Sequence, residues 1–282
     1  MIQIQNKSIE IKLLGFSGGE RHIQLSGLPE ELNAPLDVKT DLLTSDAIID
    51  LLLLDNALSN HYHKKILMNL EVPYFPYARQ DRVCAEGQAY SLEVIANLLN
   101  SLDLNSLTVW DCHSPVTVGL TGAKNISPVD IIKTSKSLMA NLRDEKSILV
   151  CPDKGAVERC TRLKEILGVK EIIYCGKIRA PETGKIIGTE VLADDLSGKT
   201  AIITDDICDG GKTFIKIAEE LKRKNVDQVY LYVTHGIFSK GLEVFDGLID
   251  KIFTTNSFPQ KEDKKLTVIN YKQNNLNKGE VR

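Results

Sequence analysis

The chain has 282 residues, which corresponds to one or two domains at roughly 100–200 residues each. Apolar residues make up 43% of it and charged residues 26%, as in ordinary globular proteins. The formal net charge is −3, so the chain lacks the basic excess typical of proteins that bind nucleic acid or membrane surfaces, and we expect neither partner.

The first part of the chain predicts short strands followed by one buried helix. Apolar and polar residues alternate between Ile2 and Leu25, which indicates short strands joined by turns. The stretch Asp46–Asn60 has apolar residues on nearly every side and predicts a buried helix, with Ser45 as its N-cap. Alternation then predicts a strand over Ile66–Val72.

The remainder predicts alternating strands and helices. The expected strands are Leu107–Trp110, Ile148–Cys151, Ile172–Cys175, Ala201–Thr204 and Val229–Thr234. The expected helices are Ser91–Leu102, Ile131–Leu142, Ala156–Leu167 and Lys212–Lys222. This alternation predicts an α/β fold with a mostly parallel sheet and helices on both faces. Ligands in such folds bind beyond the carboxyl ends of the strands, so the residues that follow each strand are the candidates for a site.

The strand Ala201–Thr204 is followed by an acidic, glycine-containing segment and a helix. The segment reads Asp205-Asp206-Ile207-Cys208-Asp209-Gly210-Gly211-Lys212-Thr213. Its glycines would let backbone N–H groups approach a phosphate at the helix N-terminus, and its carboxylates would accept hydrogen bonds from ribose hydroxyls. A P-loop is disfavoured because Asp206 stands where the first glycine is required. The bland alternative is a turn before a helix that Asp209 caps.

Two other strand ends carry candidate metal ligands. His113 follows the strand that ends at Trp110, and Asp153 follows the strand that ends at Cys151. Together they could hold a hydrated Mg²⁺ with nucleotide phosphates completing its shell, because Mg²⁺ takes only one or two protein ligands in such sites. On spacing alone, a lone histidine is more often structural than a ligand.

Two further segments carry candidate phosphate ligands. The segment Tyr74–Asp81 offers aromatic rings for a base and Arg79 for a phosphate, although a packed turn with a solvated salt bridge would have the same composition. Lys177 and Arg179 lie one residue apart after the strand that ends at Cys175. Surface cations are common, so this spacing alone assigns them no role.

The chain start and the cysteines predict a cytoplasmic protein. Residues 1–8 lack the basic-then-apolar order of a signal peptide, and the densest apolar run, Ile48 to Leu54, is too short to span a bilayer. The six cysteines show neither a CxxC pair nor metal-site spacing, so we expect reduced thiols.

Taken together, these segments resemble the ribose-phosphate pyrophosphokinase family, also called PRPP synthetases. The matching segments are Tyr74–Asp81, Asp111–His113, Pro152–Asp153, Lys177–Arg179, Asp205–Thr213, Thr234–Ser239 and Thr254–Gln260, in the family's order. Phe16–Glu20 resembles a Phe-Ser-Asp-Gly-Glu loop of the family, with Gly18 in place of the acid or amide. The phosphate loop also departs from the family, reading Asp-Gly-Gly-Lys-Thr where the family prefers Asp-Thr-Ala/Cys/Gly-Gly-Thr.

The resemblance implies two domains, each like a type I phosphoribosyltransferase. Residues 1–126 with a returning segment, 266–282, would form the first, and residues 127–265 the second. It implies transfer of the β,γ-diphosphate of ATP to the 1-hydroxyl of ribose 5-phosphate, giving PRPP and AMP, with Mg²⁺ as cofactor. It further implies a homo-oligomer, dimer or hexamer, with an ATP site shared between subunits.

The resemblance also implies a role for each candidate residue. ATP would be bound by Phe16, Gly18, Glu20, Arg79, Gln80, Asp81 and His113. Ribose 5-phosphate would be bound by Arg179, Asp205, Asp206, Asp209, Gly210, Gly211, Lys212 and Thr213. Lys177 and Arg179 would be catalytic and close over the transferring diphosphoryl group, and His113 and Asp153 would hold Mg²⁺.

Three other functions stay open. A catalytically silent, regulatory relative of a PRPP synthetase would be free to lose His113, Asp153 and Lys177, which this chain retains. A phosphoribosyltransferase that consumes PRPP would share the acidic loop but would not need Arg79-Gln80-Asp81 or a second domain. A nucleotide sensor without activity has no positive feature in the sequence.

Overall fold

The chain folds into two units. The computed structural model describes residues 2–5, 8–32, 34–179 and 186–272. The units are Met1–Ser127 and Pro128–Arg282. Among the described residues, no helix combines the length and the apolar character needed to cross a membrane.

A five-stranded sheet forms the centre of the first unit. Its order is β1 (Ile2–Ile4), β4 (Leu36–Thr40), β5 (Met68–Val72), β6 (Leu104–Trp110) and β7 (Lys124–Ile126). β1 pairs antiparallel with β4, and the other neighbours are parallel. The carboxyl ends of β5 and β6 therefore lie at the same edge of this sheet, where the segments 73–81 and 111–114 begin.

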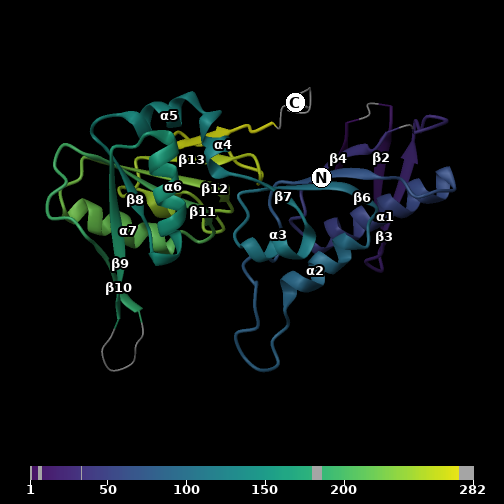
Figure 1. Cartoon of the computed structure of the whole chain (residues 1–282), viewed down its shortest axis with the longest axis horizontal. Helices are drawn as coiled ribbons and strands as arrows, with labels where there is room; N and C mark the ends of the chain where they lie inside the picture. The colour runs from purple at the N-terminus through teal and green to yellow at the C-terminus, as the bar shows by residue number, and fades with distance from the viewer. Residues whose placement is uncertain (1, 6–7, 33, 180–185, 273–282) are drawn as a thin grey trace, which may run out of the picture. The chain divides into compact units, whose positions relative to one another are not determined.

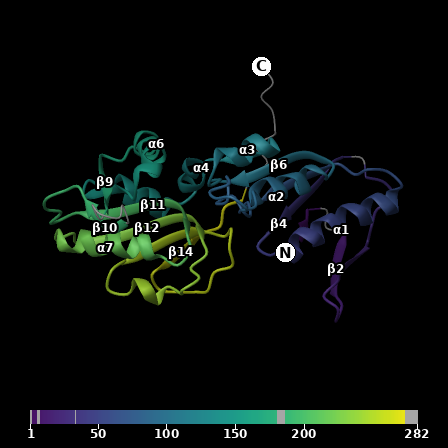
Figure 2. The same cartoon turned by 90° about the horizontal axis from the view of Figure 1, so that it is seen from below.

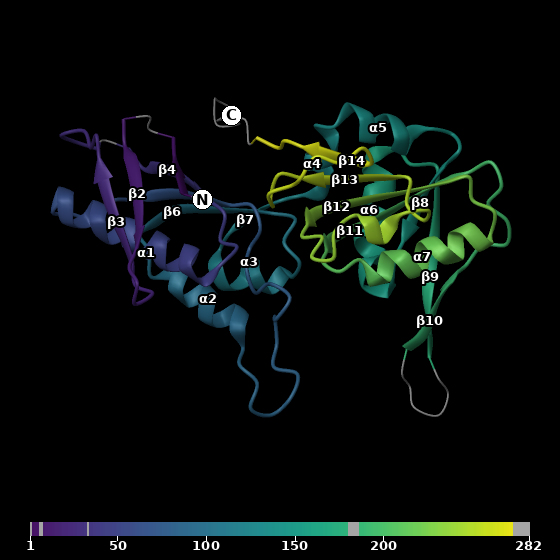
Figure 3. The ribbon, with the colours of Figure 1, turned by 180° about the vertical axis from the view of Figure 1, so that it is seen from behind.

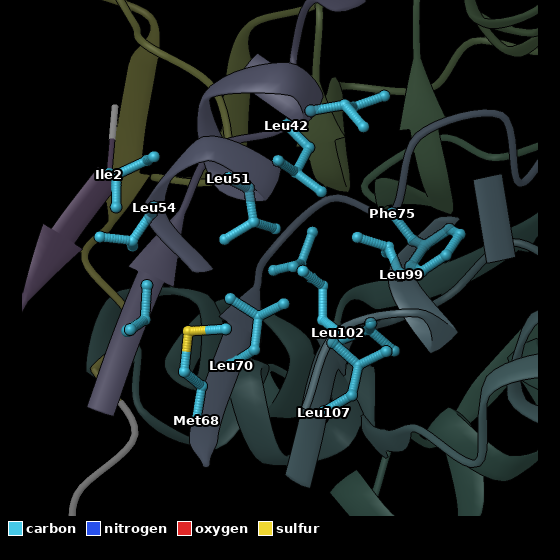
Figure 4. Packing of buried hydrophobic residues seen from close by; sticks show 14 of the residues in the cluster. Ile2, Leu42, Leu51, Leu54, Met68, Leu70, Phe75, Leu99, Leu102 and Leu107 are labelled. Atoms are coloured by element: carbon cyan, nitrogen blue, oxygen red, sulfur yellow. The ribbon is translucent and has the colours of Figure 1, made fainter. Parts of the chain in front are cut away.

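The helices of the first unit lie on one side of its sheet. They are α1 (Ser45–Tyr62), α2 (Ser91–Asn100) and α3 (Pro115–Thr121), and all run below the strands in Figures 1 and 3. Figure 4 shows the apolar core between them, in which Leu51 and Leu54 of α1 pack with Met68 and Leu70 of β5. The N-cap of α1 is Thr44 and not Ser45 as expected, because Thr44 has extended backbone angles and its hydroxyl accepts from Ala47 N–H.

The opposite side of this sheet is polar, so the expectation of helices on both faces is wrong for the described part of the first unit. Asn69 donates to Asp37 Oδ1 at 2.8 Å and accepts from Asn105 Nδ2 at 2.8 Å. Lys39 pairs with Glu71 at 2.7 Å across β4 and β5. Because side chains alternate along a strand, one face of β4 and β5 is apolar and packs on the helices while the other carries this hydrogen-bonded ladder.

Between β1 and β4 the chain forms an antiparallel hairpin that is separate from the five-stranded sheet. It consists of β2 (Glu10–Gly15) and β3 (Arg21–Ser26), joined by the loop Phe16–Glu20. Arg21 binds the buried carboxylate of Asp50 on α1 with two hydrogen bonds, of 2.9 and 2.6 Å. Such a two-pronged guanidinium–carboxylate contact fixes direction as well as distance, so the hairpin is held against α1.

The second unit contains a seven-stranded sheet. Its order is β10 (Ile186–Val191), β9 (Glu171–Arg179), β8 (Ser147–Cys151), β11 (Thr200–Cys208), β12 (Gln228–Gly236), β13 (Lys251–Thr255) and β14 (Leu266–Ile269). Within the described part of this sheet, only the β10–β9 pair is antiparallel. The expected return of residues 266–282 to the first domain is wrong for β14, because β14 pairs in parallel with β13 and extends the second sheet. Residues 273–282 lie outside the described residues.

Helices cover both faces of the second sheet. Helices α4 (Pro128–Lys133), α5 (Lys136–Arg143) and α6 (Val157–Leu167) lie on one side, and α7 (Lys212–Arg223) lies on the other, where it contacts β10 and β12 (Figures 1 and 2). One continuous helix was expected over Ile131–Leu142. The structure has two, because Ser135 leaves the helical conformation and its hydroxyl caps α5 by accepting from Leu138 N–H.

Candidate active site

The acidic pair Asp205–Asp206 lies within strand β11 and not after it. The expected strand ended at Thr204, but parallel pairing with β12 continues through Asp205 and Val233 to Cys208 and Gly236. The acidic pair therefore lies in a part of β11 that pairs with β12 and extends past Ile203, where the pairing with β8 ends. Asp206 is buried and Asp205 is half-buried.

Burial makes the Asp205 carboxyl hard to ionise. Desolvation raises the pKa of Asp205 well above its ordinary value, and the neighbouring Asp206 carboxyl raises it further. The guanidinium of Arg159, on α6, opposes both effects. Arg159 Nη2 also donates to the main-chain oxygen of Asp205 at 3.0 Å.

We expect Asp205→Asn to raise the melting temperature by a few degrees at pH 8. The pKa of Asp205 is higher in the folded chain than in the unfolded chain, so the folded state binds more protons between the two values and loses stability as pH rises. A neutral amide removes this penalty. Thermal unfolding at pH 4 and pH 8 checks it: the gain should shrink at pH 4, and the exposed Asp194→Asn should show neither effect. A lower melting temperature at pH 8 for Asp205→Asn would contradict the assignment.

The loop after β11 is braced by the segment that follows β12. Ser239 Oγ donates to Asp209 Oδ1 at 2.6 Å, and Ser239 N donates to the Asp209 carbonyl at 3.1 Å. The N–H groups of Ile237 and Phe238 both bond to the Cys208 carbonyl, at 2.9 and 3.1 Å. The position of Asp209 is therefore fixed from a second loop.

Gly211 forms the start of α7 and requires its hydrogen side chain. Its φ is +74°, and a Cβ atom there would lie 2.5 Å from Phe245 Cζ. Phe245 is fully buried and packs edge-on against Phe238 at 6.3 Å between ring centroids. Glycine at this position therefore lets the main chain lie directly against the ring of Phe245.

Helix α7 begins without a side-chain cap. Its N-cap is Gly211, and its first turn contains no acidic residue, so the alternative in which Asp209 caps this helix is wrong. The first N–H groups of a helix have no partner within it, and they favour an anion. With Gly210 beside them and Lys212 and Thr213 in the first turn, these groups form a cradle suited to a phosphate.

The cationic pair lies on an extended strand. β9 continues to Arg179, with Lys177 paired to Thr189 and Arg179 paired to Ile186 of β10. Both cations are thus on an antiparallel strand pair at the edge of the second sheet, although their side chains lie outside the described parts of the structure. Residues 180–185 are likewise not described.

Asp153 stands at the carboxyl end of β8, next to β11. Its Oδ1 accepts from Gly155 N–H at 3.0 Å and from Ala156 N–H at 3.2 Å, which starts the short helix η1 (Lys154–Ala156) ahead of α6. A carboxylate at this position is an oxygen donor of the kind that Mg²⁺ prefers. Across the described ranges, no group of three or more His, Cys, Asp or Glu side chains is arranged to hold a metal ion.

His113 lies at the carboxyl edge of the first sheet. It is exposed, between β6 and α3, in a turn that begins with the buried Asp111 at a φ of +38°. Such positive φ values are strained for residues other than glycine and persist only where surrounding contacts impose them. Here Asp111 N–H bonds to the Ile126 carbonyl at 2.8 Å and Cys112 N–H to Asn125 Oδ1 at 3.0 Å.

The segment that follows β5 is partly a packed turn. Phe75 is buried, while Arg79 and Gln80 are exposed. Asp81 pairs with Arg82 at 3.6 Å, which is the solvated salt bridge that the sequence left open as an alternative. Arg79 and Gln80 nevertheless project from the same sheet edge as the His113 turn.

The remaining candidates form the hairpin loop Phe16–Glu20. The ring of Phe16 is 56% exposed, and its N–H bonds to the Glu20 carbonyl at 2.9 Å. A Cβ atom at Gly18 would lie 2.5 Å from Glu20 Oε2, so glycine allows the Glu20 carboxylate to fold over this turn.

The structure thus groups the candidates by unit. The second unit brings Asp153, Asp205 and the Asp209 loop to neighbouring strand ends, while Arg79 and His113 share an edge of the first sheet and Phe16–Glu20 is on its own hairpin. Sequence reasoning missed Arg159 and Ser239, which hold Asp205 and Asp209. The only signal for Ser239 was its place in a matching segment, and Arg159 had none.

Comparisons with known proteins cover most of this chain. A family model described as phosphoribosyl synthetase-associated domain matches residues 182–274. The ribose-phosphate pyrophosphokinase of Thermococcus kodakarensis is 30% identical over 256 residues, covering 90% of this chain and 87% of that protein. The one from Mycoplasmopsis pulmonis is 34% identical over 232 residues, covering 79% and 70%. The crystal structure of phosphoribosylpyrophosphate synthetase from Mycobacterium smegmatis superposes with a TM-score of 0.76 at 22% identity over 92% of this chain and 85% of that one, which confirms the predicted fold class.

Proposed function

Because this chain belongs to the ribose-phosphate pyrophosphokinase family, a family of enzymes that make PRPP, we propose that it transfers the β,γ-diphosphate of ATP to ribose 5-phosphate. The 1-hydroxyl oxygen of the sugar forms a bond to the β-phosphorus. The bond from that phosphorus to the oxygen bridging to the α-phosphate breaks, its electron pair leaves with AMP, and the hydroxyl proton is released. The products are PRPP and AMP.

The observation that carries this proposal is the arrangement at the end of β11. A phosphate fits the uncapped start of α7, where Gly210 and Gly211 expose the main chain and Lys212 and Thr213 add polar groups. The carboxylates of Asp205, Asp206 and Asp209 suit the donor hydroxyls of a ribose. A cation at Lys212 opposes the helix dipole, and a bound phosphate would offset that cost. The carboxylates would bind the sugar hydroxyls and the start of α7 would bind the phosphate, so the two together suit a sugar phosphate.

The remaining candidates are assigned to the ATP side of the reaction. We assign ATP binding to Phe16, Gly18, Glu20, Arg79, Gln80, Asp81 and His113, and the transfer step to Lys177 and Arg179. Arginine suits phosphate because its guanidinium donates two parallel hydrogen bonds. Lys177 and Arg179, one residue apart on β9, would bring two positive charges to the diphosphoryl group, and Arg179 would also contact ribose 5-phosphate.

Mg²⁺ is the cofactor that this reaction would use, and it would offset the charge of the ATP phosphates. Asp153 and His113 are the candidate protein ligands. Asp153 would then have two roles: its Oδ1 fixes the turn that starts η1, and its carboxylate would also bind Mg²⁺. We further infer a cytoplasmic location, in keeping with the free thiols of Cys151, Cys160, Cys175 and Cys208, all buried.

One assay tests the proposed reaction. Purified protein is incubated with Mg²⁺, ATP and ribose 5-phosphate, and the mixture is examined for AMP and PRPP. Both products should form in equal amounts and depend on all three additions. Formation of ADP in place of AMP would show that a single phosphoryl group is transferred, which would contradict the proposal. No turnover despite binding of both substrates would favour the silent relative, and consumption of supplied PRPP with a base would favour a phosphoribosyltransferase.

We also propose that the working enzyme is a homo-oligomer in which the loop Phe16–Glu20 serves the ATP site of a neighbouring subunit. Mixing inactive Glu20→Ala protein with inactive Lys177→Ala protein should then restore part of the activity, because a hybrid pair contains one intact site. Light scattering and mass spectrometry verify that mixed oligomers have formed. A fully active monomer, or mixed oligomers without recovery, would contradict the shared site.

A further inference from the structure

We propose that Arg159 is a positioning residue of the sugar site: it ties helix α6 to the main chain of Asp205 and brings a positive charge to the end of β11 that carries the acidic pair. This inference deepens the proposed function and rests on its assignment of Asp205 and Asp206 to the ribose hydroxyls. Arg159 would act on the substrate only through these carboxylates.

The contact geometry supports a positioning role. Arg159 lies in the first turns of α6, just after the Asp153 turn, and its Nη2 reaches across to the Asp205 carbonyl at 3.0 Å. The next residue, Cys160, has its sulfur 3.5 Å from Thr204 Oγ1, so α6 also contacts β11 at this point. The helix therefore holds the half-buried Arg159 near the carboxyl end of β11. Asp153 follows β8, the strand next to β11.

Strand alternation places the two carboxylates of the acidic pair on opposite faces of β11. Thr204 faces α6, and Asp206 shares that face because side chains two apart on a strand point the same way. Asp205 points to the other face, but its main-chain oxygen is the atom that Arg159 contacts. Arg159 therefore lies on the side of the strand that carries the Asp206 side chain, and it holds Asp205 through the main chain.

The other titratable and charged groups around Asp205 cannot replace this charge. On β11 itself they are Asp206, Cys208 and, just beyond, Asp209; burial raises the pKa of Cys208 to about 12, so that thiol stays neutral. The neighbouring elements add the thiols of Cys151 at the end of β8 and Cys160 on α6, the buried His235 on β12, which shares a hydrogen bond with Ser257, and Lys212 at the exposed start of α7. Among the charged side chains only Arg159 opposes the rise in the pKa of Asp205, and the main-chain N–H of Asp206, which donates to Asp205 Oδ1 at 3.0 Å, adds to its effect.

This arrangement has a consequence for substrate binding. A ribose with free hydroxyls needs acceptors, and a protonated carboxyl offers one donor and fewer acceptor sites. Losing Arg159 removes the positive charge that opposes desolvation and the Asp206 charge, so protonation of Asp205 should begin at a higher pH. The affinity of the Arg159 variants for ribose 5-phosphate should then fall at low pH, where the affinity of the wild type is still retained.

The test compares Arg159→Gln and Arg159→Lys with the wild type and with Arg162→Gln, which removes an exposed arginine from the same helix. Ribose 5-phosphate affinity is measured by calorimetry from pH 5.5 to 9. A pKa rise of one unit would weaken binding roughly tenfold in the acid range and little above pH 8. Arg159→Lys should fall between the wild type and Arg159→Gln, and Arg162→Gln should follow the wild type. The phosphate of ribose 5-phosphate titrates near pH 6 in every sample, so only the difference between proteins is used.

A ligand-free measurement separates this inference from the proposed function. The Asp205 carboxyl carbon, assigned by its loss in Asp205→Asn, is titrated by NMR in the wild type and in Arg159→Lys and Arg159→Gln. The midpoint should move to higher pH in the order wild type, Lys, Gln. A titration midpoint that does not move in the Arg159 variants would overturn the inference. So would a loss of affinity that is equal at every pH and comes with a lowered melting temperature, because that pattern indicates a purely structural arginine. A wild type that binds no ribose 5-phosphate would overturn the proposed function alone, since the NMR midpoint still reports on Arg159.

Discussion

Lys177→Ala is expected to lower kcat at least about a hundredfold, a barrier change of roughly 2.7 kcal/mol or more. Diphosphoryl transfer spreads negative charge between the entering and leaving oxygens and leaves little covalent chemistry for the protein. Its catalysis comes from positioning and from positive charge that is already in place. A residue that stabilises mainly the transition state lowers kcat when it is removed and leaves ground-state binding nearly intact.

The measurement separates turnover from binding. Single-turnover rates give the transfer step, and calorimetry gives the affinities for ATP and ribose 5-phosphate, which should change much less than kcat. Lys170→Ala provides a matched control, because Lys170 is exposed just before the opposite end of β9, where it pairs with Glu145. A nearly unchanged kcat with a steep rise in the KM for ATP would make Lys177 an ordinary binding residue.

The parallel core could be predicted because its strands are apolar on both sides. β8 and β12 are buried along almost their whole length, so each reads as a continuous apolar run between polar turns. The alternation of these runs with helical segments is what indicates a parallel sheet. β4 was not predicted, although it alternates buried apolar residues with Asp37 and Lys39 as a strand with one polar face does. β7 was not predicted because it is too short to show a pattern.

The extent of the strands depends on partners that the sequence does not identify. Asp205 and Asp206 have low strand propensity, yet β12 continues beside them and carries β11 to Cys208. In the same way, the antiparallel partner β10 extends β9 to Arg179. Local composition favoured an earlier end for both strands, and tertiary pairing overrode it.

In the candidate site, too, some residues could be predicted from the local sequence, whereas their distant contacts could not. Gly210 and Gly211 predict a phosphate cradle from the local sequence, because glycines before a helix let main-chain N–H groups approach an anion. The residues that hold the site in place come from far along the chain: Arg159 is 46 positions from Asp205, and Ser239 is 30 from Asp209. A single sequence carries no signal for such pairs until the fold brings them together.

Asp209→Ala is expected to weaken ribose 5-phosphate binding by about 1–3 kcal/mol, or roughly 5- to 150-fold in Kd, with ATP affinity nearly unchanged. Asp209 is half-buried in the loop between the acidic pair and Gly211, where its carboxylate can accept from a ribose hydroxyl. Alanine leaves that hydroxyl without its acceptor in a partly desolvated site. Calorimetric titration of both ligands checks the expected asymmetry.

Three further variants identify the physical cause. Ser239→Ala removes the 2.6 Å hydrogen bond that orients Asp209 but keeps the carboxylate, so its loss of affinity should be smaller than that of Asp209→Ala. Asp209→Asn keeps an acceptor for Ser239 and for the sugar without the charge, and should lie between the two. Asp194→Ala, which removes an exposed carboxylate of the same unit, should have no effect. Equal losses for Ser239→Ala and Asp209→Ala would mean that Asp209 acts only by bracing the loop, and an unchanged affinity in Asp209→Ala would remove it from the sugar site.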